Sequence, residues 1–393
     1  MSNNNKTPAI RFKGFTDTWE QRELGEIATE IIAGSDVDKS LLCEEGNCPV
    51  IANALTNDGI IGYYKNEYRV KAPAVTVTGR GDVGHAKARN DDFTPVVRLL
   101  SVKSEHDIYF LENAINAIKI VVESTGVPQL TVPQLSKNVI FYPNSAEEEM
   151  KIGTYFRNLD TLITLHQRKC DKLIQFKAAM LQKMFPQNGA DKPEIRFKGF
   201  TDAWEQRELG EVASNFEYGL NASAKEFDGK NKYIRITDID DESRMFLSDD
   251  ITSPDTDLTL ADKFKLEAGD ILFARTGASV GKTYLYREKD GLVYYAGFLI
   301  RAKINSENDA EFVFQNTLTD SYNSFIRITS QRSGQPGVNA QEYQGYNFYV
   351  PNLEEQKAIG TYFRNLDTLI TLHQRKCDKY KSIKAGLIRK LFP

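Results

Sequence analysis

The sequence is poor in cysteine and contains no long hydrophobic run. Its 393 residues include four cysteines, and Cys170 and Cys377 occupy equivalent places in a repeat described below. Such use of cysteine is typical of small buried thiols in a reducing cytoplasm. No apolar stretch approaches the ~20 residues that a membrane-spanning helix requires. The first residues, MSNNNKTP, lack the apolar core of a signal peptide, so we expect a cytoplasmic chain without a membrane segment.

Signatures of metal binding and methyl transfer are also missing. Cys43 and Cys48 lack a second nearby ligand pair, which argues against a zinc site. The sequence has no His-Glu-x-x-His zinc helix and no Asn/Asp-Pro-Pro-aromatic tetrapeptide of an amino-methyltransferase. We therefore expect a chain that performs no catalysis and holds no metal.

Size and charge narrow the class of protein further. A length of 393 residues, with 41% hydrophobic and 26% charged residues, predicts two globular units plus connecting elements. The net charge of −4 argues against a general nucleic-acid binder. It still allows a protein whose basic residues are gathered on one face.

Two segments each occur twice in the chain. Ile10–Glu26 and Ile195–Glu211 differ only at Thr18 and Ala203, and Ile152–Lys172 recurs without change at Ile359–Lys379. The residues between these repeated frames are unlike in the two halves. Simple duplication would also keep the intervening segments alike, and core packing alone would not preserve exposed positions. We infer that the frames present one face to two copies of a partner, or face each other across a pseudo-two-fold axis.

The second repeat lies within two predicted long helices, residues 147–184 and 354–391. Apolar side chains recur three and four residues apart along each helix, which predicts an antiparallel coiled coil about 50 Å long. Two histidines fall on the same stripe, where we interpret them as seam residues instead of catalytic or metal-binding groups. The predicted pairing residues are Phe156, Leu159, Ile163 and His166 in the first helix, and Phe363, Leu366, Ile370 and His373 in the second.

The segments between the frames predict compact α+β domains. Short strands are expected at 74–78, 139–142, 233–236, 270–274 and 346–350, and helices at 112–122 and 311–321. The predicted fold class is therefore α+β: two such domains in a pseudo-two-fold arrangement, separated by the two long helices. The expected division is 1–146, helix 147–186, linker 187–194, 195–352 and helix 353–393.

Two pairs of loops carry residues suited to DNA. Thr78–His85 and Thr276–Thr283 each follow a strand and combine glycines with basic or hydroxyl side chains, which suits backbone contacts to phosphate and side-chain contacts to bases. Ser124–Leu130 and Gln331–Asn339 share Gly-x-Pro and carry the residue types that pair with adenine and guanine. Plain tight turns would give similar patterns. Gly277–Thr283 also resembles an ATP-binding P-loop but is one residue short.

Together, the frame IRFKGFTDxWEQRELGE, the loop GDILFARTGASVGK and the helix frame EEQKAIGTYFRNLDTLITLHQRK resemble a type I restriction–modification specificity subunit. The resemblance covers essentially the whole chain, in the order target-recognition domain, long helix, target-recognition domain, long helix. It implies a non-catalytic subunit in which each variable domain reads one half of an asymmetric double-stranded DNA target and the helices set the spacing.

The resemblance also implies partners and contact residues. The repeated frames would dock two methyltransferase subunits, which use S-adenosylmethionine to methylate adenine N6, and thereby two restriction subunits that use ATP and Mg²⁺. This chain itself would bind no cofactor. The expected DNA contacts are Thr78, Arg80, His85, Lys87, Thr125 and Gln129 in the first domain, and Arg275, Thr276, Lys282, Arg332, Gln335 and Asn339 in the second.

Two other interpretations remain open at this point. A structural scaffold could join two identical subunits without reading DNA, which would explain the repeats but not the paired loops. An ATPase built on Gly277–Thr283 is the third hypothesis, and the missing residue in its loop counts against it.

Overall fold

Two compact units make up the chain. The computed structural model describes residues 7–120, 128–187, 189–247, 249–332 and 334–392. The first unit contains Met1–Gln167 and Gln374–Pro393, and the second contains Arg168–His373. Each unit therefore includes the end of a long helix that begins in the other half of the sequence.

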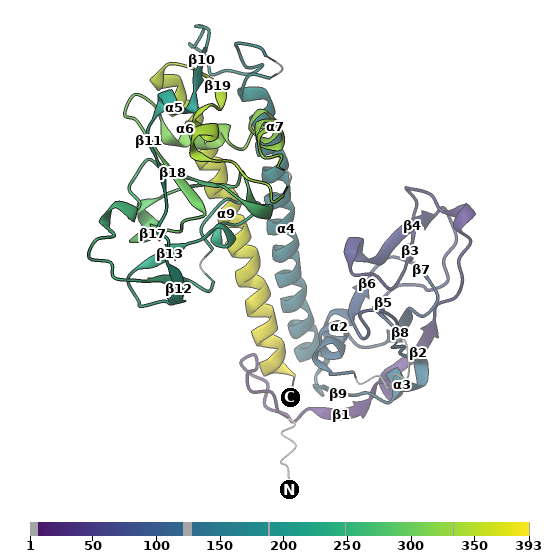
Figure 1. Cartoon of the computed structure of the whole chain (residues 1–393). Coiled ribbons are helices and arrows are strands. Elements are labelled where there is room, and N and C mark those ends of the chain that lie inside the picture. Colours follow the sequence, from purple (N-terminus) through teal and green to yellow (C-terminus); the bar gives the residue numbers. More distant parts are fainter. Residues whose placement is uncertain (1–6, 121–127, 188, 248, 333, 393) are drawn as a thin grey trace. The chain divides into compact units, whose positions relative to one another are not determined.

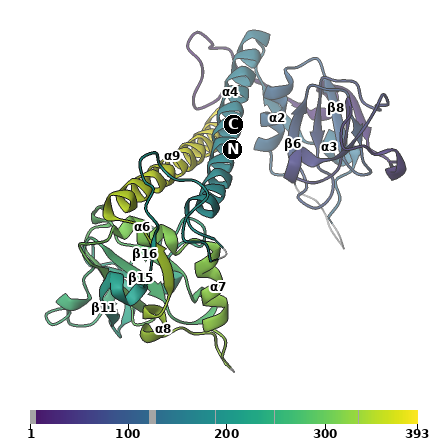
Figure 2. The same ribbon diagram turned by 90° about the horizontal axis from the view of Figure 1, so that it is seen from above.

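The two long helices extend over 39 residues each, as α4 (Ala146–Met184) and α9 (Leu353–Leu391), and they run side by side (Figures 1 and 2). Polar caps start both. The Ser145 hydroxyl lies 3.4 Å from the Glu148 amide, and the Asn352 side chain accepts from the Glu355 amide at 3.0 Å. Acidic residues in each first turn favour the helix dipole. The prediction of two long paired helices is confirmed.

Cross-helix contacts fix the direction of this pairing. In the first unit, the Lys384 ammonium lies 2.7 Å from the Asp160 carboxylate, and the Cys377 sulfur lies 3.9 Å from the Ile163 carbonyl oxygen. Residue numbers thus rise on one helix as they fall on the other, so the helices are antiparallel. In the second unit the equivalent contacts join Cys170 to Ile370 and Lys177 to Asp367.

Burial follows the predicted stripe of pairing residues. Phe156, Leu159 and His166 are buried, as are Phe363 and Leu366. Ile163, Ile370 and His373 are half-buried. The His166 ring stacks on Tyr380, with 5.7 Å between ring centroids, so this histidine packs in the seam.

The first unit is built on an antiparallel four-stranded sheet in the order β2-β8-β5-β6. A smaller sheet has the order β4-β3-β7, with β3 and β7 parallel, and β1 pairs with β9. The strands are β1 (Glu20–Glu23), β2 (Ala28–Ala33), β3 (Cys48–Ile51), β4 (Ile60–Tyr64), β5 (Ala74–Val77), β6 (Ala86–Arg89), β7 (Thr94–Pro95), β8 (Leu100–Ser104) and β9 (Val139–Tyr142).

The second unit repeats this plan. Its main sheet has the order β11-β18-β15-β16, its smaller sheet the order β12-β14-β13-β17 with β13 and β17 parallel, and β10 pairs with β19. The strands are β10 (Glu205–Glu208), β11 (Ala213–Tyr218), β12 (Ser223–Glu226), β13 (Lys232–Ile234), β14 (Thr252–Asp255), β15 (Asp270–Ala274), β16 (Thr283–Leu285), β17 (Val293–Tyr295), β18 (Leu299–Ile304) and β19 (Asn347–Val350). The predicted α+β class with two domains is confirmed.

Short helices complete both units, and two of the predicted helices had the wrong bounds. The helix expected at 112–122 begins earlier, because the Asp107 side chain accepts from the amides of Tyr109 and Phe110. The helix expected at 311–321 is two helices, because Thr319 caps a new one. The helices are α1 (Leu24–Ile27), α2 (Ile108–Ala117), α3 (Val132–Ser136), α5 (Leu209–Val212), α6 (Ala310–Asn316), α7 (Asp320–Thr329) and α8 (Ala340–Gln344).

The tryptophan of each repeated frame packs against the end of a long helix from the other half of the chain. Trp19 is 1% exposed, and its ring centroid lies 6.1 Å from that of Phe392, just past α9. Trp204 is 3% exposed and lies 6.3 Å from Phe185, just past α4. Both frames therefore make the same internal contact, which is one physical reason for their identity.

Candidate nucleic-acid interface

The two predicted loops of the first unit lie next to each other. The Leu130 amide donates to the Gly79 carbonyl at 2.9 Å, and Arg80 forms a β-bridge with Gln129. The glycine loop is thereby joined to the Gly-x-Pro loop, although about fifty residues separate them in sequence. Arg80 and Gln129 are both exposed at this junction. Thr125, the other candidate on the second loop, lies outside the described residues.

The second unit brings its two loops together in the same way. The Val338 amide donates to the Arg275 carbonyl at 2.9 Å, and the Gly277 amide donates to Pro336 at 3.0 Å. Thr276 forms an antiparallel β-bridge with Gly337. Because Gly79 and Arg275 accept the equivalent bond, they occupy equivalent positions in the two units.

Each glycine loop closes by the same backbone bonds. In the first unit, the Thr78 amide donates to His85 at 3.0 Å and the Gly84 amide to Thr78 at 2.8 Å. The second unit uses Ala274, Lys282 and Gly281 for these bonds. Gly84 and Gly281 have φ values of +90° and +81°, a conformation that favours glycine.

Two predicted contact residues are occupied inside these loops. Thr78 is 5% exposed, and its hydroxyl accepts from the His85 amide and donates to the Asp82 carbonyl. Lys282 is 7% exposed, and its ammonium lies 2.6 Å from Asp241 and 3.0 Å from the Ile239 carbonyl. These side chains hold the loops, so we remove both from the proposed DNA contacts. Lys282 is also the lysine that a P-loop would use to bind phosphate, so its occupied ammonium argues further against ATP binding.

Two further candidates stabilise short helices. Asn339 accepts from the Glu342 amide at 2.9 Å and thereby caps α8. Arg332 donates to the carbonyls of Thr329 and Gln331 at 2.7 and 2.9 Å and pairs with Glu342. Helix capping accounts for both side chains without a ligand, and we remove them as well.

The remaining candidates surround the loop junctions. Lys87 is partly exposed and lies 4.0 Å from Asp58, too long for a strong pair. Desolvation by neighbouring atoms lowers the pKa of His85, so its ring is neutral near pH 7 and can both donate and accept. Gln335 is exposed beside Gly277, where its amide nitrogen would lie 2.9 Å from a β-carbon added to that glycine.

Two glycine patterns in these loops match catalytic motifs by letter but not by structure. Gly79–Gly84 reads Gly-x-Gly-x-x-Gly, yet strand β6 follows it, where a dinucleotide site requires a helix N-terminus. Gly277–Gly281 reads Gly-x-Ser-x-Gly, yet it leads into strand β16. A Ser-His-Asp triad would also need a histidine, and the one histidine in the second unit's sequence, His373, is a residue of α9.

Sequence reasoning missed two aromatic residues at the second junction. The Arg275 guanidinium carbon lies 4.9 Å from the ring centroid of Tyr218 and 5.8 Å from that of Phe298. All three line a cleft of about 600 Å³. Tyr218 precedes a glycine and Phe298 follows one, each at a strand end. An exposed aromatic in that setting is the signal that could have identified them.

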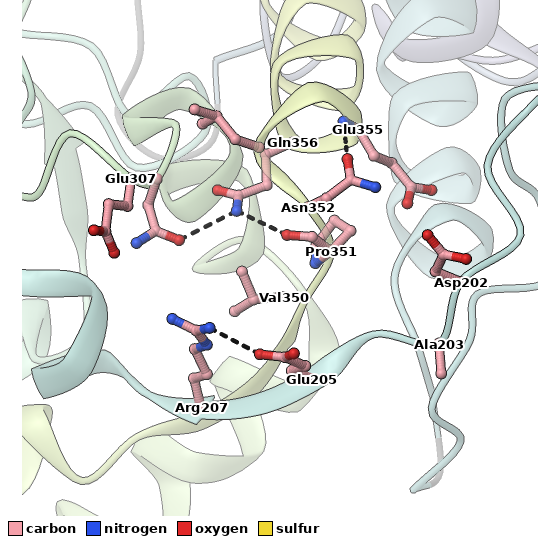
Figure 3. A pocket seen from close by; sticks show the side chains of 12 residues that line it. Asp202, Ala203, Glu205, Arg207, Glu307, Val350, Pro351, Asn352, Glu355 and Gln356 are labelled. Atoms are coloured by element: carbon pink, nitrogen blue, oxygen red, sulfur yellow. Dashed lines mark hydrogen bonds and ion pairs between the residues drawn. The ribbon is translucent and has the colours of Figure 1, made fainter.

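A different surface pocket lies on the repeated frame. In the second unit it has a volume of about 320 Å³ and is formed by the frame and the first turn of α9 (Figure 3). Asp202, Ala203 and Glu205 come from the frame, and Glu307 from the loop before α6. Ala203 is the position where the two frames differ.

Beside this pocket, an arginine ties the frame to the long helix. Arg196 forms two hydrogen bonds with the Glu355 carboxylate, at 2.9 and 2.7 Å, and Arg11 does the same with Glu148 at 2.8 and 2.6 Å. Both glutamates are almost fully buried. Such two-point pairing fixes geometry as well as energy, so each frame has a set position on its helix.

Neither a metal site nor a membrane span is found in the described part of the chain. No three His, Cys, Asp or Glu side chains there form a group that could hold a metal ion. None of the helices described is long and apolar enough to cross a membrane.

Comparison with known proteins gives a consistent result. The profile of the family described as "Type I restriction modification DNA specificity domain" matches residues 16–175 and again residues 201–381. A putative type I specificity subunit of Mycoplasma pneumoniae is 28% identical over 145 residues, which are 36% of this chain and 43% of that protein. The putative MjaX specificity subunit of Methanocaldococcus jannaschii is 25% identical over 197 residues, 48% of this chain and 45% of that protein.

These matches span less than half the length of either relative. Among solved structures, the S subunit of a type I restriction–modification system from M. genitalium superimposes with a TM-score of 0.70 at 16% identity. The superposition covers 98% of this chain and 99% of that one. At this identity, the likeness shows the fold.

Proposed function

The chain belongs to the type I restriction modification DNA specificity family, with two copies of the family's domain, and from this premise we propose that it reads a two-part DNA target for a restriction–modification complex. Each unit would recognise one half of the target. The chain itself would perform no catalysis and bind no cofactor.

The observation that carries this proposal is one scaffold with two different sets of exposed side chains. Both units use the same order of strands in the main sheet and join their two loops by equivalent hydrogen bonds. The side chains at the junction differ: Gly79 in the first unit is replaced by Arg275 in the second. A conserved framework with altered contact groups is what reading two different base sequences requires, so the target should be asymmetric.

The proposed contacts are the exposed or partly exposed polar residues at each junction. In the first unit, Arg80 and Lys87 would bind phosphate or guanine, and Gln129 and neutral His85 would contact base edges. In the second unit, Arg275, Thr276 and Gln335 would take these roles. Thr125 stays a proposal from sequence alone.

The repeated frames would bind partner subunits, and the pairing helices would set the distance between the two units. Each frame is fixed on a long helix by a buried arginine–glutamate pair, while acidic side chains of the frame such as Glu205 remain exposed. We propose that this common surface docks two methyltransferase subunits, which would supply S-adenosylmethionine and methylate adenine N6. Two restriction subunits, with ATP and Mg²⁺, would join through them. The antiparallel helices would set the spacing of the half-sites.

Methylome sequencing tests the proposal. A host carrying this gene with its methyltransferase partner is compared with a strain that lacks this gene alone. The expected result is an asymmetric two-part motif, methylated on adenine, that disappears in the deletion strain. Unchanged methylation would contradict DNA readout and favour a scaffold that only joins subunits.

A domain exchange tests the division of labour. Residues 30–140 are replaced by the corresponding segment of another specificity protein, and the frames are kept. One half of the methylated motif should change while the other half stays. A change in both halves would contradict independent reading by the two units.

A further inference from the structure

The cleft beside Arg275 lies where three neighbouring strands of the second unit end. The main sheet places β11, β18 and β15 side by side. Tyr218 is the last residue of β11, Phe298 directly precedes β18, and Arg275 directly follows β15. Three residues that are distant in sequence are therefore held at one edge by the ladder of the sheet.

Hydrogen bonds hold Arg275 and its aromatic neighbours in place. The Arg275 amide donates to the Phe298 carbonyl at 3.1 Å, and its carbonyl accepts from Val338 at 2.9 Å. The Tyr218 hydroxyl accepts from the Ala340 amide at 3.2 Å. The guanidinium then packs against both rings. Contact with the two rings restricts the plane of the guanidinium before any ligand binds.

The charge of Arg275 is not matched by a carboxylate within the residues described. The arginines of this unit that do pair with Asp or Glu are Arg196, Arg207, Arg235, Arg287, Arg301 and Arg332. The Nε atom of Arg275 is buried without a hydrogen-bond partner. An unmatched, oriented cation at the edge of a 600 Å³ cleft is suited to an electronegative partner that supplies acceptors.

The first unit has other residues at the three described positions that correspond to this cluster. Matched backbone bonds, Gly34 to Leu99 and Gly219 to Leu299, set the correspondence of the two units. Ala33 then stands where the second unit has Tyr218, and Arg98 where it has Phe298. Gly79 replaces Arg275. The cluster of Arg275 with Tyr218 and Phe298 thus has no counterpart at the equivalent described positions of the first unit.

We propose that Arg275 reads a guanine in the half-site of the second unit, donating two hydrogen bonds to O6 and N7, and that Tyr218 and Phe298 position it. This inference rests on the proposed DNA readout. Two parallel bonds to one base edge require a fixed guanidinium plane, which the two rings provide. A phosphate can also accept two parallel bonds from a guanidinium, so the test below separates a base contact from a phosphate contact.

The test uses the full chain in complex with its methyltransferase partner and a DNA library randomised in both half-sites. Arg275→Lys keeps the charge and loses the planar fork. Preference for guanine at one position of the second half-site should fall by about 10- to 100-fold, while preferences in the first half-site stay unchanged. Arg327→Lys, the same change at an exposed arginine on α7, should leave both half-sites as they are.

Phe298→Leu and Tyr218→Leu test the positioning role, because the arginine stays in place. Each should weaken the same guanine preference by a smaller factor. If Arg275→Lys abolishes binding altogether, these two variants decide: a weaker preference supports the proposal, and an unchanged one overturns it.

The other outcomes are also decisive. A uniform loss of affinity with all base preferences intact would assign Arg275 to a phosphate and overturn guanine readout. A wild-type motif without guanine in the second half-site would also overturn guanine readout by Arg275, but it would leave the proposed function intact. If the wild-type complex selects no motif at all, the proposed function fails together with this inference.

Discussion

Gly153 is the position where one added methyl group should be most informative. It lies in α4 against the start of α2, and a β-carbon built there would be 1.9 Å from the Asp107 carboxylate oxygen and 3.0 Å from the Phe110 amide nitrogen. That carboxylate accepts from the amides of Tyr109 and Phe110 and caps α2. Gly153→Ala must therefore displace the cap.

The magnitude follows from three opposing effects. Loss of an N-cap costs about 0.5–2 kcal/mol, and overpacking of a tight contact costs about 1–3 kcal/mol. Replacing a helical glycine by alanine gains up to about 1 kcal/mol. We expect Gly153→Ala to lower the free energy of unfolding of the first unit by about 1–3 kcal/mol.

Gly386 provides a matched control on α9 in the same unit, since a β-carbon there would have no atom within 4 Å. Gly386→Ala should raise the free energy of unfolding of the first unit by up to about 1 kcal/mol. The chain has two tryptophans, one per unit, so a Trp204→Phe background lets Trp19 fluorescence report denaturant unfolding of the first unit. If Gly153→Ala stabilises as much as Gly386→Ala, the close packing of α2 on α4 is refuted. In an Asp107→Ala background the cost of Gly153→Ala should shrink.

Three further predictions concern single contacts. The hydrogen bond to Glu149 raises the pKa of His106, so the pair stabilises the fold fully below the unfolded pKa and loses this contribution as pH rises through the folded pKa. The Asp107 and Asp309 amides donate to Glu149 and Gln356 in the same way, so Asn308 is the residue equivalent to His106. His106→Asn should therefore fit the site, and it should destabilise more at pH 6 than at pH 8.5 in denaturant unfolding. The opposite trend would contradict the pairing. Lys384→Met breaks a partly buried pair with Asp160 and should lower the free energy of unfolding by about 1 kcal/mol. Lys381→Met, at an exposed position, is the control and should change it very little. Equal effects of the two substitutions would refute the cross-helix pair. Gly277→Ala forces φ +71° on alanine and crowds Gln335, so it should weaken DNA binding in a gel-shift assay, while Gly334→Ala, with open space around it, serves as the control that should not.

The sequence predicted the elements with strong local signals and failed where tertiary contacts decide. The long helices follow from an apolar stripe with capping residues at Ser145 and Asn352, both of which act locally. The end of α6 was missed because Thr319 starts a new helix through one side-chain bond. Lys282 was expected to contact DNA, but in the structure it pairs with Asp241. The two residues are about forty positions apart in sequence, so no local pattern could predict this ion pair. For the same reason, Tyr218 and Phe298 could be placed beside Arg275 only once the order β11-β18-β15 was known.

Closure of each unit by the other half's helix explains where the chain can vary. Trp19 packs against Phe392, and Trp204 packs against Phe185. A change in either frame must therefore keep its ring contact with the end of the long helix. Arg80 and Arg275 themselves lie outside the core clusters that contain Trp19 and Trp204. Side chains there can change without disturbing the contacts that close the unit. A chain organised in this way can alter either half of its binding preference while its pairing surfaces stay the same, which is the division that the two nearly identical frames and the two dissimilar inserts display.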